Sequence, residues 1–374
     1  MASAQIIEWD TLSDSEPLER DYMAWVKRQH SKGQIDRAGS VLIGAKSPEE
    51  YESALTIINN WRACHSYPLH IVKKTLSLRA KTVSSSALIA QRLKRLPSIA
   101  LKLNQNVNMQ LSQMQDIGGC RAVMPNVADV KKLIALYDES RSKNPRSGRP
   151  IEHERYDYIA TPKPDGYRSI HLIFKYQSQY EDKQEFNGQR IEIQIRSKLQ
   201  HAWATTVETV QTFTGQALKS KVKTGDPEWL RFFALMGSEI ALREKRPPVP
   251  GTPENRNELI GEIRHLEEKL SVAHSLRAWG FAVQRITENQ IGAVAYMLVL
   301  NSSEKTLVIE PFKPHEMAKA SARYLEIEKE MEKRPEIQAV LVSVETMEDL
   351  RTAYPNYYLD TSAFIDAMNQ AIGK

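Results

Sequence analysis

Two acidic residues occupy positions from which they could hold a divalent cation. Asp116 directly precedes an apolar segment that is expected to form a strand, and Glu192 alternates with isoleucines in RIEIQIR (190–196). Successive side chains of a strand point to opposite faces, so the polar residues of this segment share one face. Mg2+ is usually held by one or two carboxylates together with substrate phosphates. The same spacing also fits the solvated outer face of an edge strand, and the spacing alone favours neither interpretation.

A basic cluster lies in RLKRLPSIALK (92–102) and consists of Arg92, Lys94, Arg95 and Lys102, with Ser98 between them. We expect the surrounding segment, 84–102, to be helix-rich and interrupted at Pro97, because proline lacks an N–H group and has a fixed φ. The free N–H groups of a helix start, together with these cations, would suit a phosphate. A charge run on a helix is more often a solvated face, so the cluster by itself is weak evidence.

A third polar group follows a strand end in DYIATPKPDGYRSIH (157–171). An aromatic residue on a turn can stack on a base, a lysine can meet a phosphate, and a glycine lets the backbone approach a ligand. The plainer interpretation is a hairpin turn whose tyrosine covers the sheet. The usable side chains of this segment are Lys163, Tyr167, Arg168, Ser169 and His171.

The hydrophobic periodicity predicts the elements that would position these residues. Strands are expected at 120–124, 155–160, 169–177 and 190–196, with a helix over 127–140. Further helices are expected at 15–36, 48–64, 201–213 and 227–244. The Pro-rich stretch 246–256 then marks a boundary, followed by an apolar helical seam that should pack on its own domain, a hairpin at 293–312, a strand at 339–344 and a last helix at 361–372. The seam consists of Leu259, Ile263, Leu266, Leu270 and Ala273.

The composition narrows the classes of protein to consider. The chain has 374 residues, 41% of them hydrophobic, and a formal net charge of +5, which suits anionic ligands without amounting to a dedicated nucleic-acid-binding composition. Cys64 and Cys120 are too few for a disulfide framework or a cysteine-based zinc site. The N-terminus lacks the features of a signal peptide, and no stretch is long and apolar enough to span a membrane, so we expect a cytoplasmic protein.

Four segments, taken in order, resemble the synthetase domain of the RelA/SpoT alarmone synthetases. They are 92–102, DIGGCRAV (116–123), 157–171 and IEIQIRSKLQHAWA (191–204), and the resemblance extends over roughly 80–245. It implies an α+β fold, namely a nucleotidyltransferase-like mixed β-sheet flanked by helices. It also implies transfer of the β,γ-pyrophosphoryl group of ATP to the 3′-hydroxyl of GDP or GTP, giving (p)ppGpp and AMP, with Mg2+ as the cofactor.

The resemblance also assigns roles to residues of this chain. The catalytic and metal-binding residues would be Asp116 and Glu192, where Glu192 either ligates the ion or takes the proton of the attacking hydroxyl. The ATP-binding residues would be Arg92, Lys94, Ser98, Lys102 and Arg121. The residues that bind the acceptor nucleotide would be Lys163, Tyr167, His171, Gln194 and Arg196, with Tyr167 stacking on the base and His201 in a supporting role.

The expected organisation is a helical N-terminal segment (1–80), the synthetase domain (81–245) and a small C-terminal α+β domain of unknown role (257–374). Long members of the family carry a hydrolase domain with an adjacent His-Asp pair. Residues 1–80 contain only His30, His65 and His70, none followed by Asp, so degradation of the product is not expected. The C-terminal domain does not resemble the regulatory domains of the ribosome-associated members.

Two other functions are compatible with the sequence. Some short relatives are toxins that pyrophosphorylate the 3′ end of tRNA, and the basic stretch 140–150 could meet an RNA backbone, although a solvated loop is the commoner case. The fused C-terminal domain would then be a neutraliser or sensor, as in phage defence. The chain could instead be a catalytically dead nucleotide-binding module, but the intact acidic pair opposes this. Helical seams also leave a homo-oligomer open.

Overall fold

The computed structural model describes residues 25–45, 47–143, 151–214, 227–270, 272–273, 276, 295–301, 306–334, 337–343 and 361–374. Its centre is a five-stranded sheet in the order β1-β2-β5-β4-β3, in which β2 and β5 are parallel and the other pairs are antiparallel. The strands are β1 (Leu88–Leu93), β2 (Gly118–Met124), β3 (Ile151–Asp157), β4 (Ile170–Lys175) and β5 (Arg190–Ser197). A mixed sheet flanked by helices confirms the expected α+β class.

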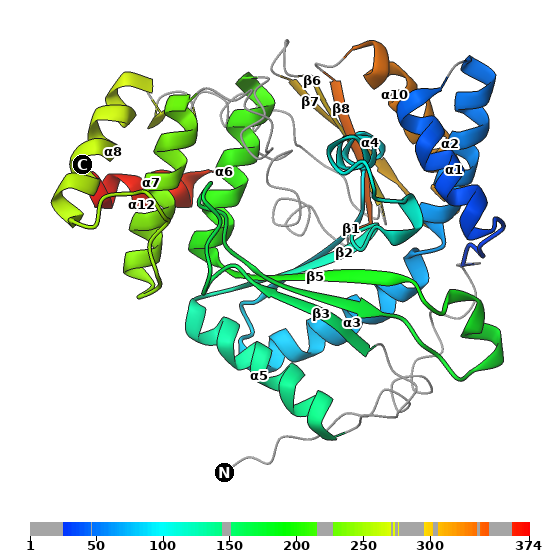
Figure 1. Ribbon diagram of the computed structural model, residues 1–374, viewed down its shortest axis with the longest axis horizontal. Coiled ribbons are helices and arrows are strands. Elements are labelled where there is room, and N and C mark those ends of the chain that lie inside the picture. Colours follow the sequence, from blue (N-terminus) through cyan, green and yellow to red (C-terminus); the bar gives the residue numbers. More distant parts are fainter. Residues whose placement is uncertain are drawn as a thin grey trace.

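Helices α3 (Ser66–Val83) and α5 (Val127–Lys143) cover one face of this sheet (Figure 1). Strand β5 presents Ile191, Ile193 and Ile195 to the interior, and all three side chains are buried, as the alternation in the sequence predicted. They pack with Leu76 of α3 and other apolar residues of β2 and β4 in one core. The polar residues of β5 are therefore free to face the opposite side, where the candidate site lies.

The N-terminal part forms helices α1 (Lys32–Gly44) and α2 (Pro48–Ala63), which pack on α4 (Leu96–Gln105) and on the short 3-10 helix η2 (Leu111–Gln113). Ser47 caps α2 by accepting a hydrogen bond from the N–H of Glu50, as its sequence predicted. Of the expected helix at 15–36, residues 32–36 are confirmed as the start of α1, whereas residues 25–31 are not helical and residues 15–24 lie outside the described part of the chain. Ser31 forms a capping box with Gln34, and this cap fixes the start of the helix.

The helix-rich interpretation of 84–102 is also wrong, because residues 88–93 form strand β1. Residues 88–93 pair with β2 along the whole strand, from Leu88 opposite Val123 to Leu93 opposite Gly118. The backbone hydrogen bonds to β2 outweigh the local helix propensity of these residues. The helix begins only after this strand, with Pro97 in its first turn.

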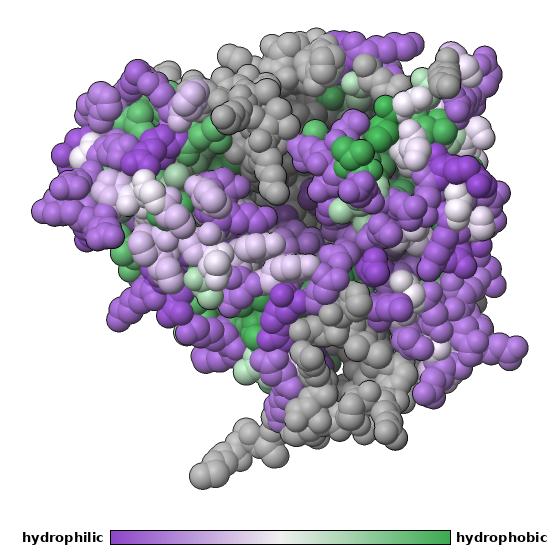
Figure 2. All heavy atoms as spheres, viewed as in Figure 1, coloured by the Kyte–Doolittle hydropathy of each residue, from purple (hydrophilic) through white to green (hydrophobic). Residues whose placement is uncertain are grey.

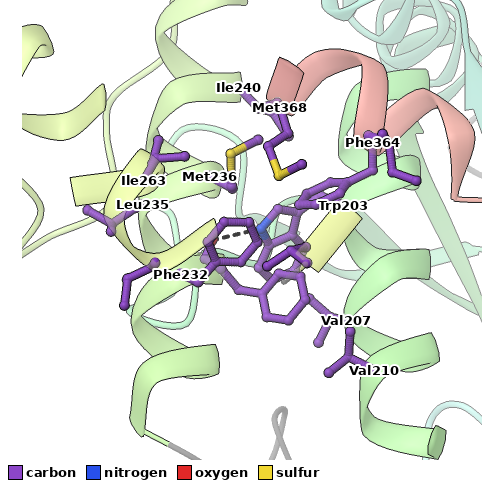
Figure 3. Close-up of a cluster of buried hydrophobic side chains, with 14 of the residues drawn as sticks. Trp203, Val207, Val210, Phe232, Leu235, Met236, Ile240, Ile263, Phe364 and Met368 are labelled. Carbon is purple, nitrogen blue, oxygen red and sulfur yellow. Dashed lines mark hydrogen bonds between the residues drawn. The ribbon is translucent and has the colours of Figure 1, made fainter. Parts of the chain in front are cut away.

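A bundle of four helices lies beside the sheet: α6 (Lys198–Thr214), α7 (Pro227–Arg243), α8 (Arg256–Leu270) and α12 (Ser362–Ile372). These helices were all expected, and Leu259, Ile263 and Leu266 of the apolar seam are buried within the same chain. Figure 3 shows Phe364 and Met368 of the last helix packed among Trp203, Phe232 and Met236. The Trp203 indole N–H donates to the carbonyl of Phe233 at 2.8 Å, so this buried donor is satisfied.

The remaining elements form a smaller three-stranded antiparallel sheet in the order β7-β6-β8. Its strands are β6 (Ala295–Asn301), β7 (Thr306–Phe312) and β8 (Ile337–Ser343), with a 3-10 turn η4 (Pro314–Glu316) and helix α10 (Met317–Lys333) packed on it. The expected hairpin and strand are thereby confirmed. Residues of the expected unit 257–374 thus lie in two places, since α8 and α12 join the helical bundle while β6, β7, β8 and α10 lie beside α2 and β1 (Figure 1).

Hydrophilic residues cover most of the face shown in Figure 2, and the hydrophobic residues on it form separate patches. None of the helices in the described part of the chain is both long and apolar enough to cross a membrane. One further 3-10 helix, η3 (Glu181–Phe186), precedes β5 and contributes the buried Phe186.

Candidate active site

The two candidate carboxylates come together at the parallel pair of central strands. Asp116 lies two residues before β2, and Glu192 of β5 is paired with Gly119 of β2. Both side chains line one open pocket, which also receives Arg92, Lys94, Arg121 and Gln194. A Cβ atom at Gly118 would lie 2.7 Å from the end of the Ile191 side chain, so a larger residue at this strand start would require Ile191 to shift. Residues from β1, β2 and β5 therefore build the pocket.

Asp116 is bridged by two lysines. The Nζ atom of Lys94 lies 2.8 Å from one carboxylate oxygen and the Nζ atom of Lys102 lies 2.9 Å from the other. Burial acts to raise the pKa of Asp116, but the attraction of Lys94 and Lys102 outweighs it and holds the pKa below its ordinary value. Asp116 is therefore ionised at neutral pH. It binds both lysines of the basic cluster and also lines the pocket.

Glu192 is bound by its neighbours on the same face of the sheet. Its carboxylate lies 2.9 Å from Nδ1 of His171 and accepts a hydrogen bond from Nε2 of Gln194 at 2.7 Å. Burial and the charge of Asp116 act to raise the pKa of Glu192, whereas the bonds from His171 and Gln194 lower it, and the lowering prevails. The influence of Asp116 on this pKa is consistent with the two carboxylates facing the same pocket.

A chain of hydrogen bonds continues from Glu192 to Tyr167. The hydroxyl of Tyr167 lies 2.8 Å from Nε2 of His171, whose other ring nitrogen faces Glu192. A neutral imidazole with its proton on Nδ1 satisfies both contacts, because it donates to Glu192 and accepts from Tyr167. Burial raises the pKa of Tyr167 to about 12, so this hydroxyl stays protonated and can donate.

An aromatic wall, formed by the rings of Tyr158 and Tyr167, lies beside these residues at the turn before β4. Gly166 has a φ of +95°, and a Cβ atom there would lie 2.9 Å from the ring of Trp203, so only glycine fits this turn. The Nζ atom of Lys163 lies 4.3 Å from the ring centre of Tyr158 and 5.1 Å from that of Tyr167. Tyr158 was not singled out from the sequence, although it stands in the same segment.

The other predicted residues lie around this centre. Arg196 is buried and lies 2.5 Å from Nδ1 of His201 through Nη2, and burial together with Arg121 lowers its pKa to about 9. Ser98 stands in the first turn of α4, outside the residues that line the pocket. Residues 144–150 of the basic stretch lie outside the described part of the chain. The structure thus collects most of the predicted residues in one place, while their individual roles stay predictions.

The donor set bears on the expected cofactor. Within the described ranges there is no group of three or more His, Cys, Asp or Glu side chains arranged to hold a metal ion. The pocket does offer two ionised carboxylates, Asp116 and Glu192, and Mg2+ commonly takes one or two carboxylates with the remaining positions filled by phosphate and water. The residues present therefore fit Mg2+ that arrives with a nucleotide better than they fit a resident metal.

Part of the chain that contains this site is similar to known proteins. Residues 91–213 match the family described as the region found in RelA / SpoT proteins. The GTP pyrophosphokinase of Escherichia coli (strain K12) is 25% identical over 154 residues, which cover 41% of this chain and 18% of that protein. GTP pyrophosphokinase YjbM of Bacillus subtilis (strain 168) is 27% identical over 165 residues, covering 43% of this chain and 65% of that protein.

Among solved structures, the small alarmone synthetase 2 from Bacillus subtilis has 20% sequence identity and a TM-score of 0.39, covering 50% of this chain and 92% of that one. The chain spans only about a fifth of the Escherichia coli protein, as the 18% coverage shows. The matched region, 91–213, contains both candidate carboxylates, the basic cluster and the aromatic turn. The similarity to the region found in RelA / SpoT proteins is thus a similarity of this part of the chain.

Proposed function

We propose that this chain is a pyrophosphokinase that transfers the β,γ-pyrophosphoryl group of ATP to the 3′-hydroxyl of GDP or GTP, making (p)ppGpp. The observation that carries the proposal is the assembly of Asp116 and Glu192 with Arg92, Lys94 and Arg121 around one pocket. Pyrophosphoryl transfer asks a protein mainly for positioning and for neutralisation of phosphate charge. The similarity of the matched region to GTP pyrophosphokinases supports the same reaction.

The cations at the β1–α4 junction would bind ATP. Arg92 and Lys94 line the pocket, Lys102 reaches Asp116 from α4, and Ser98 in the first turn of that helix would offer a hydroxyl. Arg121, on the neighbouring strand β2, would add a planar donor group suited to phosphate oxygens. When ATP enters, Lys94 and Lys102 would exchange the carboxylate of Asp116 for phosphate oxygens, which releases Asp116 for the metal ion.

Asp116 and Glu192 would hold Mg2+. When bound, the ion would neutralise phosphate oxygens and help to align them for in-line attack. Glu192 would either complete the metal site with Asp116 or take the proton of the attacking hydroxyl, and its distance to that hydroxyl in the substrate complex decides between the two roles. His171, which contacts both Glu192 and Tyr167, would orient the carboxylate of Glu192.

The acceptor nucleotide would lie against the aromatic wall. Lys163 would meet its phosphates, and a tyrosine ring would stack on the base, with Gln194 and Arg196 as further polar contacts. Tyr167 is half-buried and its hydroxyl is bound to His171, whereas Lys163 lies closest to the ring of Tyr158. Tyr158 therefore joins Tyr167 as a candidate for the stacking residue.

The test offers the purified protein Mg2+ and ATP labelled in the γ-phosphate, with GDP, GTP or bulk tRNA in parallel. We expect label on the guanosine nucleotides by thin-layer chromatography. Label on tRNA alone would replace this function with pyrophosphorylation of the tRNA 3′ end. If no acceptor is labelled, while a bound ATP analogue is detected by calorimetry, the chain would be a nucleotide-binding module and the enzyme proposal would be lost.

A further inference from the structure

Arg62, near the end of α2, links the candidate site to a distant part of the chain. Its side chain is only 9% exposed, and its Nε atom donates to the backbone carbonyl of Lys94 at 3.0 Å. Lys94 is the residue whose ammonium group lies 2.8 Å from Asp116. The guanidinium of Arg62 therefore lies directly behind the strand end that presents this lysine to the pocket.

The peptide of Lys94 is held on both sides. Its N–H group donates to the carbonyl of Ile117 at 2.7 Å, and its carbonyl accepts from Arg62. Lys94 lies between β1, which ends at Leu93, and α4, which begins at Leu96. Its carbonyl is therefore held neither by the hydrogen bonds of a strand nor by those of a helix. The contact with Arg62 supplies the missing constraint at the junction from which Lys94 reaches Asp116.

Helix α10 holds Arg62 from the other side. Nη2 donates to the hydroxyl of Tyr324 at 3.2 Å, Nη1 lies 3.4 Å from the carboxylate of Glu328, and the guanidinium carbon lies 5.2 Å from the Tyr324 ring centre. Glu328 is 2% exposed and Tyr324 is 6% exposed, so this is a desolvated contact in which each partner depends on the others. Asn59 accepts a further bond from Nη1 at 2.7 Å.

We propose that Arg62 is a positioning residue for Lys94, and that Tyr324 and Glu328 of α10 hold its guanidinium in place, so that the module of β6, β7, β8 and α10 is part of the scaffold of the phosphate site. A planar guanidinium can bond the Lys94 carbonyl through Nε while its two Nη groups bond α10, and a lysine at this position cannot make these bonds together. The role in ATP binding rests on the proposed function, whereas the effect on Lys94 does not.

The experiment compares Arg62→Lys, Tyr324→Phe and a control, Lys329→Ala, in the full chain. Lys329 forms an exposed ion pair with Glu52 across the same α2–α10 contact, 3.1 Å apart, without touching Arg62. Each variant is treated with an acetylating ester, and the rate of modification of Lys94 is measured by mass spectrometry relative to that of Lys102. Thermal midpoints verify folding, and the KM for ATP is measured separately from kcat.

We expect Lys94 to be modified about tenfold faster in Arg62→Lys and about threefold faster in Tyr324→Phe, in line with the loss of hydrogen bonds to a charged group. The KM for ATP should rise by a similar factor in Arg62→Lys, with kcat within about twofold. The control should match the unmodified protein. Tyr324→Phe removes a single hydroxyl and keeps the test decisive if Arg62→Lys does not fold.

An unchanged rate of Lys94 modification in a folded Arg62→Lys or Tyr324→Phe variant would overturn the proposal. Faster modification in a chain that transfers no pyrophosphate to any acceptor would support the positioning role while removing the proposed function. Equal acceleration by Lys329→Ala would also count against it, because loosening of the whole α2–α10 contact would then explain the result.

Discussion

Asp116 and Glu239 are both carboxylates bridged by two cations, yet they serve different parts of the molecule. Asp116 lies between Lys94 and Lys102 and lines the pocket, with 19% of its side chain exposed. Glu239 of α7 has no exposed side-chain surface and is bonded by Arg243 and Arg256, each at 2.8 Å. The same balance of charge thus occurs once at an open pocket and once inside the helical bundle.

This difference shows that the residues bonded to a carboxylate and its exposure to solvent indicate its role better than the charges around it do. Arg243 binds Glu239 and also the carbonyl of Ala367, so it connects α7 with α12. An arginine fork makes several directional bonds at once, which suits a fixed junction, whereas a lysine is a flexible point charge that can change partners. The lysines at Asp116 therefore suit a site where phosphate arrives and leaves.

The comparison is tested most strongly by Asp116→Asn. This variant keeps the shape of the side chain and removes the charge that would hold Mg2+, so we expect pyrophosphoryl transfer to fall about 1000-fold or more. The labelled-ATP assay measures this loss, and circular dichroism verifies the fold. Glu239→Gln should transfer within a few-fold of the unmodified protein, and a similar collapse in that variant would erase the distinction between the two sites.

The next largest effect should come from Glu239→Gln on stability. Removing the charge leaves Arg243 and Arg256 without their shared counter-ion beside a fully buried position, so we expect the free energy of unfolding to fall by about 3 kcal/mol. Denaturation by urea, followed by circular dichroism, gives this value. Asp116→Asn should lose less, because 19% of the Asp116 side chain is exposed at an open pocket, whereas the Glu239 side chain has no exposed surface. An equal loss in both variants would speak against this difference in access.

The hydrophobic pattern was sufficient to predict much of the fold. The alternation in RIEIQIR gave β5 and its polar face, and the seam at Leu259, Ile263 and Leu266 predicted a helix that packs within its own chain. Strand β1 was missed because its residues carry no alternation, and pairing with β2 decides their conformation. Helix α3, which covers the sheet, was not predicted either.

The sequence predicted the residues of the candidate site that lie in the four short segments of the resemblance. Asp116 and Glu192 are far apart in the sequence, and their meeting at one pocket follows from the parallel pairing of β2 with β5. The contact of Arg62 with Glu328 joins residues separated by 266 positions, and no local period encodes such a pair. Its only signal in the sequence is an arginine in the last turn of a helix, which also has an ordinary explanation as a helix-dipole partner.

The decrease of the unfolding free energy at acid pH, here called the acid limb, should also distinguish Glu239 from Asp116. The pKa of Glu239 is lowered by its bonds to Arg256 and Arg243, although burial acts in the opposite direction. Its contribution is therefore complete above the ordinary glutamate value of 4.5 and is lost as the pH falls through the lowered pKa. Glu239→Gln should reduce the slope of unfolding free energy against pH below that value by up to about 1.4 kcal/mol per pH unit.

Urea titrations at several pH values below 5 measure this slope. Asp116 also has a lowered pKa, so Asp116→Asn should flatten the same limb, with its change centred at lower pH because the ordinary value of aspartate is 3.8. An acid limb that is unchanged in Glu239→Gln would mean that this carboxylate is not bridged in solution.

The smallest effect distinguishes the two arginines of the Glu239 cluster. The side chain of Arg256 is 61% exposed, whereas that of Arg243 is 21% exposed and also binds the carbonyl of Ala367. We expect Arg256→Gln to lower the free energy of unfolding by less than about 1 kcal/mol, since an exposed cation contributes little, and Arg243→Gln to cost more. Urea denaturation of both variants gives the comparison. Equal losses of unfolding free energy in the two variants would show that both arginines stabilise Glu239 to the same extent. The difference in their exposure would then not matter, and the cluster would resemble Asp116 with its two lysines.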